Sequence, residues 1–142
     1  MKNNKDILGS VLKTAQMGQT GIRSVIKQSP GEKLEAALKD QLSEYDAIES
    51  EAVKIAQARG WKLKELSPVS KIMSDMMSRA ILMRDPSDSR IAAMMIQGNT
   101  RGVIKGLKNA HQHQNRDPQI EALSAKLIQC ENTNIQQMKH YL

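Results

Sequence analysis

The sequence predicts an all-α domain built as a four-helix bundle. Five segments repeat apolar residues at i, i+3, i+4 and i+7, which places them on one face of a helix. No segment shows the alternation of a strand, and no internal repeat is found. Four segments are long and one is short, a pattern typical of two helical hairpins joined by one long connection. The 142 residues suffice for a single domain, 1–142, with one core.

The first two helices are expected at about 6–28 and 32–59. Proline and glycine in Ser29-Pro30-Gly31 cannot continue the first helix, so a short turn should form there. Gly60 is suited to the left-handed position that ends the second helix. The predicted apolar faces are Leu8, Leu12, Ala15, Ile22 and Ile26 on the first helix, and Leu34, Leu38, Tyr45, Ile48, Ala52 and Ile55 on the second.

The short third helix is expected at about 68–84. Ser67 is a suitable N-cap, and Pro68 fits the first helical position. At ~1.5 Å per residue this helix covers about 25 Å, enough with its flanks to return along the bundle. We therefore predict a long crossover that contains it. Its apolar face is Val69, Ile72, Met73, Met76, Met77 and Ala80.

The last two helices are expected at about 88–113 and 119–141. Ser87 is placed to cap the first of them, and the segment 115–118, with its proline, closes it with a short turn. This second hairpin should be antiparallel, like the first. The predicted inward residues are Ala92, Ile96, Val103, Leu107 and Ala110 on one helix, and Ile120, Leu123, Leu127, Met138 and Tyr141 on the other.

Each long helix carries polar residues on its apolar face. Gln19 and Gln41 each lie about 11 residues from the centre of the first turn, and Asn99 and Asn134 about 17 residues from the centre of the second, so the depths are roughly 16 and 26 Å. These depths add up to about one helix length. If the two turns lie at opposite ends, the four residues meet at one level. The candidate polar layer is Gln19, Gln41, Tyr45, Asn99, Glu131 and Asn134.

With these hairpins and this layer, the chain resembles the ferritin-like superfamily. The resemblance implies a central site for two metal ions, in which two helices each give a Glu and two give a Glu-x-x-His pair. Gln19, Gln41 with Tyr45, and Asn99 stand in three of those positions, and only Glu131 keeps the expected residue type. We therefore expect a divergent bacterial member with a vestigial metal site, no bound metal and no other cofactor.

The rest of the ligand set also departs from the superfamily pattern. Glu-Asn-Thr-Asn at 131–134 stands where Glu-x-x-His is implied, and His111, His113 and His140 all lie near helix ends without completing that pair. Amides bind iron and manganese weakly, and one carboxylate cannot balance two divalent ions. We expect an amide cluster that fixes helix register. The alternative is an oxidase or storage relative with an altered di-iron or dimanganese site around Glu131 and Tyr45.

Small and soft residues mark a candidate interface. Gly98, Gly102 and Gly106 each cost about 0.5–1 kcal/mol relative to alanine in a helix, so a close contact should compensate. That contact is close packing within the chain or a contact between subunits of a homodimer. The glycines could instead make room for a ligand or mark a local break in the helix. Methionine surfaces suit adaptable partners or simply fill a core. The candidate interface residues are Met73, Met76, Met77, Gly98, Gly102 and Gly106.

Composition narrows the remaining functions. The net charge is +6, and Arg90, Arg101, Lys105 and Lys108 share one helix face, which could follow a phosphate backbone. Only 2% of the residues are aromatic, so base stacking has little support and a solvated face is preferred. Nucleic-acid binding is the second alternative.

Location and activity follow from absences in the sequence. No apolar run approaches the ~20 residues of a membrane span, and no secretory leader is apparent. Cys130 is the single cysteine, as suits a reducing cytoplasm, and it is expected to be a buried, inert thiol. No catalytic motif is found. We therefore expect a non-catalytic structural or protein-interaction module, a homodimer without membrane contact.

Overall fold

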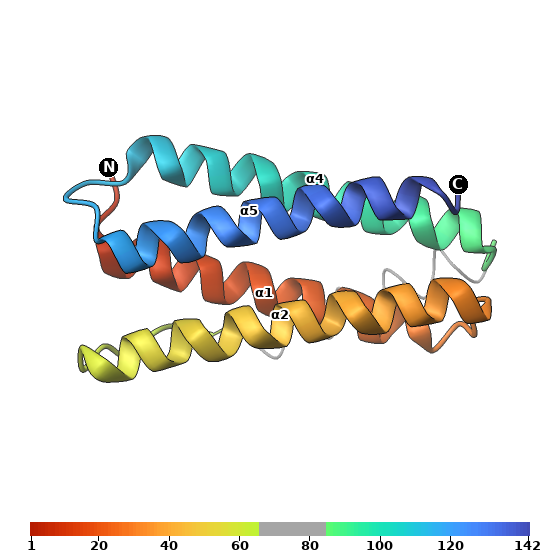
Figure 1. Ribbon diagram of the computed structural model, residues 1–142, viewed down its shortest axis with the longest axis horizontal. Coiled ribbons are helices and arrows are strands. Elements are labelled where there is room, and N and C mark those ends of the chain that lie inside the picture. The colour runs from red at the N-terminus through yellow and green to blue at the C-terminus, as the bar shows by residue number, and fades with distance from the viewer. Residues whose placement is uncertain (66–84) are drawn as a thin grey trace.

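The structure, a computed structural model, describes residues 1–65 and 85–142. Within these ranges α1 (Asn4–Ile26), α2 (Glu32–Ala58), α4 (Asp88–Gln112) and α5 (Pro118–Lys139) pack as two helical hairpins, without strands (Figure 1). The prediction of an all-α four-helix bundle is confirmed. None of these four helices has both the length and the apolar character needed to cross a membrane. The predicted short helix at 68–84, with Met73, Met76 and Met77, lies outside the described residues.

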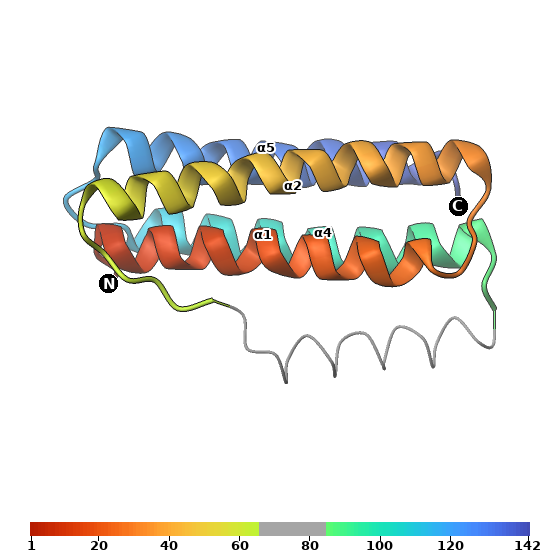
Figure 2. The ribbon, with the colours of Figure 1, turned by 90° about the horizontal axis from the view of Figure 1, so that it is seen from below.

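The two hairpin turns lie at opposite ends of the bundle. The Gly31 backbone N–H in the first turn donates to Asp88 Oδ1 at the start of α4, at 3.0 Å. At the other end, Arg59 after α2 pairs with Asp117 in the second turn. As a result α1 and α5 run in one direction, and α2 and α4 run in the other (Figure 1). Figure 2 shows α2 and α5 in one layer and α1 and α4 in the other.

Local signals set the helix ends. Asn3 and Asp6 form a capping box at the start of α1, so this helix begins two residues before the predicted position. Ser87 caps α4 through its side chain, and Gly60 has the predicted positive φ of +66°. Asp117 caps α5, and Pro118 is the first helical residue.

The core matches the sequence pattern well in α2 and poorly in α4. All six predicted residues of the α2 stripe are buried. On α4, however, only Ala92 of the five predicted residues is buried, and Leu107 is 47% exposed. Ile96 is partly buried against the core, but the prediction was wrong for Leu107. Gly102 and Gly106 lie against Glu131 and Ile128 of α5, so a polar and glycine-rich edge of α4 faces the bundle. That edge consists of Met95, Asn99, Gly102, Gly106 and Asn109.

Candidate functional site

Three residues of the candidate polar layer meet in the core, one each from α2, α4 and α5. The Tyr45 hydroxyl oxygen lies 2.9 Å from Asn99 Oδ1 and 2.9 Å from Glu131 Oε2. The three side chains are at most 3% exposed. We call these residues the central triad. They tie three helices together at one level.

The contacts of the central triad require one proton more than tyrosine can supply. The Tyr45 hydroxyl has a single hydrogen, but it faces two acceptor oxygens. If the Glu131 carboxyl is protonated, it donates to Tyr45, and Tyr45 donates to Asn99. Rotating the Asn99 amide by half a turn would also supply a proton, because Nδ2 would then donate to the Tyr45 oxygen. The Asn99 Oδ1 would in turn be left without a partner in place of Nδ2. In the present orientation the buried Asn99 Nδ2 has no partner among the described residues.

Burial explains why this extra proton is available. It raises the pKa of Glu131 to about 7, and the hydrogen bond with Tyr45 opposes that rise. Burial, together with the neighbouring Glu131 carboxylate, raises the pKa of the Tyr45 hydroxyl well above its usual value. Tyr45 therefore keeps its proton at neutral pH, whereas the Glu131 carboxyl group gains and loses its proton in this pH range. Glu131 is thus a buried group whose charge changes near neutral pH.

Two other layer residues are buried but make their hydrogen bonds elsewhere. Gln41 donates to Gln137 Oε1 on α5 at 2.8 Å. Gln19 donates to Asp46 Oδ1 at 2.8 Å and to Glu49 Oε1 at 3.1 Å, both on α2. These glutamines cross-link neighbouring pairs of helices and form no hydrogen bond with the central triad. The predicted layer is therefore a set of separate hydrogen-bonded contacts.

Asn134 and Cys130 lie one turn apart on α5, beside the central triad. Asn134 is 1% exposed, and its Nδ2 lies 3.7 Å from Cys130 Sγ. The Cys130 thiol donates to Glu44 Oε2 at 3.0 Å. Burial, followed by the hydrogen bond with Glu44, raises the pKa of this thiol, which is half-buried rather than buried as expected. A thiol that keeps its proton is a poor nucleophile.

Two glycines make room for the central triad. A Cβ on Gly18 would lie 2.5 Å from the Tyr45 ring, and a Cβ on Gly102 would lie 2.5 Å from Glu131 Oε1. Real Cβ atoms essentially never come this close, so an alanine at either position would force the Tyr45 ring or the Glu131 carboxyl group to shift. The close contact expected to compensate for Gly102 therefore lies within the chain.

The other two glycines of the candidate interface differ from each other. A Cβ on Gly106 would meet Ile128 of α5 at 2.6 Å, so this position also serves packing within the chain. A Cβ on Gly98 would meet nothing within 4 Å. Of the three α4 glycines, Gly98 is the one that borders open space.

The central triad does not fit a pair of divalent metal ions. No group of three or more His, Cys, Asp or Glu side chains that could hold a metal occurs in the described part of the chain. Glu131 is the single carboxyl group of the triad, and a hydroxyl and an amide complete it. Two divalent ions need more negative charge than one carboxylate supplies.

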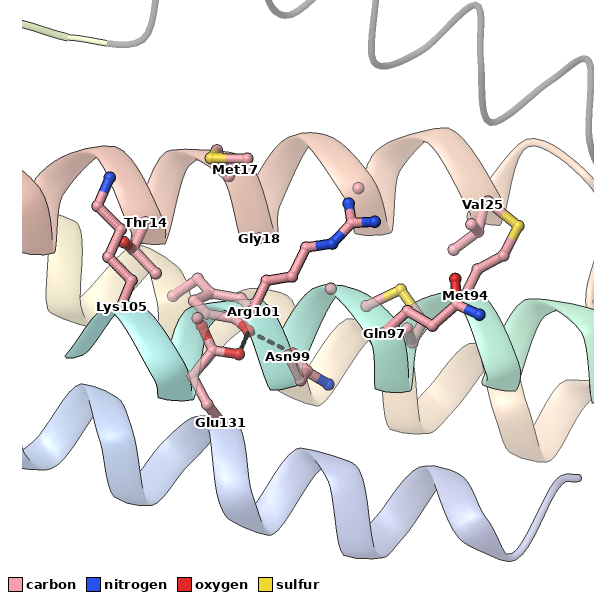
Figure 3. Close-up of a pocket in the computed structure, with 15 residues that line it drawn as sticks. Thr14, Met17, Gly18, Val25, Met94, Gln97, Asn99, Arg101, Lys105 and Glu131 are labelled. Carbon is pink, nitrogen blue, oxygen red and sulfur yellow. Dashed lines mark hydrogen bonds between the residues drawn. The ribbon is translucent and has the colours of Figure 1, made fainter. Parts of the chain in front are cut away.

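A cavity of about 480 Å³ lies between α1 and α4, above the central triad (Figure 3). Its floor includes Tyr45, Asn99 and Glu131. Arg101 and Lys105 extend from α4 toward α1 across it. The wall residues that carry apolar side chains or none are Met17, Gly18, Gly21, Val25, Met94, Met95, Gly98 and Gly102. The spacing of these residues contains no signal for a cavity, since it depends on how two helices pack.

The predicted basic face is solvated. Arg90, Arg101, Lys105 and Lys108 are all exposed. Two of the four, Arg101 and Lys105, also border the cavity. These two therefore combine a charged surface position with contact to a concave site.

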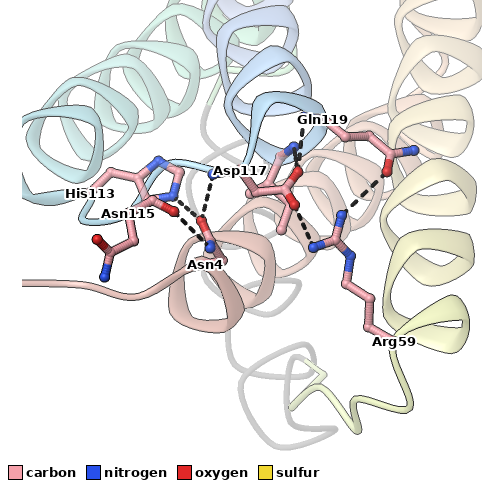
Figure 4. Close-up of polar contacts among 7 residues, drawn as sticks. Asn4, Arg59, His113, Asn115, Asp117 and Gln119 are labelled. Atoms are coloured by element: carbon pink, nitrogen blue, oxygen red, sulfur yellow. Dashed lines mark hydrogen bonds and ion pairs between the residues drawn. The ribbon is translucent and has the colours of Figure 1, made fainter.

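Sequence reasoning missed a second polar cluster, at the end of the bundle that holds the α4–α5 turn (Figure 4). Asn4 Oδ1 lies 2.6 Å from His113 Nε2 and accepts from the Asp117 backbone N–H at 3.0 Å. Asn4 Nδ2 donates to the Asn115 carbonyl at 3.0 Å. The Asp117 carboxylate caps α5 and pairs with Arg59. We call these five residues the end cluster. His113, expected near a helix end without a role, is in fact buried there.

The chain has no match among protein-family models, curated proteins or solved structures. What the structure shows is a four-helix, all-α bundle, and these comparisons assign it to no family.

Proposed function

We propose that this chain is a non-catalytic, ferritin-like helical bundle whose metal site has been replaced by hydrogen-bonding side chains. One observation carries the proposal. At the depth where the resemblance implies a set of carboxylates and histidines, the triad presents one carboxyl group, and its Oε2 is engaged by Tyr45. The opposite placement of the two turns supports the same kinship. The role that remains is structural, or that of a protein-interaction module.

Metal analysis tests this proposal directly. The purified chain is incubated with Fe(II) or Mn(II) and desalted, and its metal content and melting temperature are then measured. We expect far less than one ion per chain and an unchanged melting temperature, because a ligand set this poor cannot hold a metal pair. Two ions per chain, with anomalous scattering beside Glu131, would overturn the proposal. That result would favour the alternative of an altered di-iron or dimanganese oxidase or storage protein around Glu131 and Tyr45.

Two exposed apolar residues on α4 are consistent with the homodimer that we expect. Ile104 and Leu107 lie one helical turn apart and are 49% and 47% exposed. Light scattering should give a dimer for the native chain and a monomer for the double variant Ile104→Ser/Leu107→Ser. Lys108→Ser, a polar position on the same helix, is the matched control and should stay dimeric. A monomeric native chain at micromolar concentration would refute the dimer.

Two further expectations belong to the proposal. The cytoplasm remains the expected location, and nucleic acid remains an unlikely partner despite the exposed basic residues. A basic phosphate contact would show as DNA binding that weakens steeply with salt. We expect no retardation of DNA on a gel at low salt.

A further inference from the structure

We propose that the cavity between α1 and α4 binds a small, largely apolar carboxylate. The cavity shares its floor residues with the central triad, but the proposal rests on no kinship and does not require the metal site to have been lost. The volume of about 480 Å³ falls within the range of ~300–1,000 Å³ that is usual for small-molecule pockets.

The walls suit an apolar ligand. Methionine side chains from both helices line them, and their flexible thioethers adapt to irregular shapes. Two of the wall glycines, Gly21 and Gly98, keep the space open, because a Cβ on either would meet nothing within 4 Å. The methionines concerned are Met17, Met94 and Met95.

The floor offers one donor and one acceptor. Asn99 Nδ2 is buried without a hydrogen-bond partner in the described part of the chain, which is unusual for a native amide. Glu131 Oε1 lies against Gly102, on the cavity wall, whereas Oε2 is the oxygen that contacts Tyr45. Both residues line the cavity, so its floor is polar whereas its walls are largely apolar.

The open side selects the charge of the ligand. Arg101 and Lys105 project across it, and neither forms an ion pair with any described residue (Figure 3). Two unneutralised cations attract a carboxylate and repel an amine. The ligand should therefore lie with its anionic group at these two residues and its apolar body among the methionines.

Methionine-methyl NMR with octanoate as the probe tests the site. We expect saturable shifts of the Met17, Met94 and Met95 methyl signals, and none for Met1 or for the buried Met138, which lie away from the cavity. Octanol should bind several-fold more weakly, and octylamine should not bind. Octanoate that shifts no cavity methionine, or that shifts Met1 and Met138 equally, would overturn the proposal.

Two matched pairs of variants sharpen the test. Gly98→Leu should fill the cavity and abolish the shifts, whereas Gly9→Leu, also an open helical position but outside the cavity, should leave them intact. Both changes raise helix propensity, so both variants should fold. Removal of one cation by Arg101→Gln should weaken binding by roughly 3- to 5-fold, the value of one exposed ion pair.

The control for the charge effect is Lys108→Gln, on the same face of α4 but outside the cavity lining. It should leave octanoate binding unchanged. Equal loss in Arg101→Gln and Lys108→Gln would indicate a diffuse charge effect and would contradict a built site. Unchanged binding in Gly98→Leu would place the probe elsewhere and would refute the proposal.

Discussion

The central triad and the end cluster are both polar contacts between helices, yet they are built differently. In the end cluster the Asn4 side chain makes hydrogen bonds from both its oxygen and its nitrogen, and the Asp117 carboxylate receives Arg59 while it caps α5. In the central triad, Asn99 Nδ2 has no partner among the described residues, and Glu131 must be protonated to complete the contacts in the present orientation. A closed network holds a structure together, whereas an open one beside a cavity can recognise a ligand.

Their carboxyl groups also respond to opposite forces. The hydrogen bond from Arg59 holds the pKa of Asp117 below its usual value, while burial raises the pKa of Glu131 to about 7. Stability that depends on Asp117 is therefore lost as pH falls through its folded-state pKa. Burial of Glu131 instead destabilises the folded chain increasingly as pH rises from the unfolded-state pKa of this residue toward 7.

The largest expected effect concerns the titration of Glu131. The folded state holds this proton above the unfolded pKa of 4.5, so the native chain should lose stability relative to Glu131→Gln as pH rises from 4.5 to about 7. A shift of this size corresponds to roughly 3 kcal/mol. Glutamine mimics the protonated carboxyl and keeps a donor for Tyr45. Chemical denaturation of both chains across this range measures the difference, and parallel curves would contradict the assigned protonation.

A smaller effect should follow from closing the space above the central triad. Gly18→Ala places a methyl group against the buried Tyr45 ring, and overpacking of this kind costs about 1–3 kcal/mol. Gly21→Ala, one turn along α1, meets open space and should instead stabilise the chain by about 0.5–1 kcal/mol. Urea denaturation compares the two. If both changes stabilised the chain equally, the Tyr45 ring would be able to move aside at little cost, and the predicted overpacking would be wrong.

The end cluster should respond to loss of a single amide. Asn4→Ala removes its three hydrogen bonds and should destabilise the chain by about 1–2 kcal/mol, because partly buried groups lose their partners. Asn132→Ala, an exposed position on α5, is the matched control and should cost nothing. An equally stable Asn4→Ala variant would mean that water replaces the cluster without loss.

The smallest effect is expected from Arg59. In Arg59→Gln the pKa of Asp117 should move back toward its ordinary value, since the hydrogen bond from Arg59 is the first cause of its depression. Acid unfolding should then begin at a slightly higher pH. NMR titration of the Asp117 carboxyl group measures this shift. If its pKa did not change, the low pKa would be due to the backbone N–H groups that Asp117 caps rather than to Arg59.

Much of the fold was predictable because its causes are local. Helix ends were predicted from capping at Ser87 and from backbone restriction at Gly60 and in the first turn. The apolar stripe of α2 is buried as its helical period predicts. The polar character of the core was also visible, since Tyr45 and Glu131 interrupt apolar faces. The Asp117-Pro118 pair is a local signal for the N-cap of α5, and sequence reasoning did not use it to place Asp117 in the end cluster.

What only the tertiary structure decided depends on how the helices approach one another. The sequence by itself determined the four long helices and the depth of their polar residues. It did not determine that α4 turns glycines rather than Leu107 toward α5, nor that Asn4 reaches His113 across 109 positions of the chain. Helical period fixes which residues share a face, but the distance and rotation between helices select the inward face. That packing creates the cavity and raises the pKa of Glu131. It also leaves Asn99 Nδ2 without a partner in the part of the chain that the structure describes.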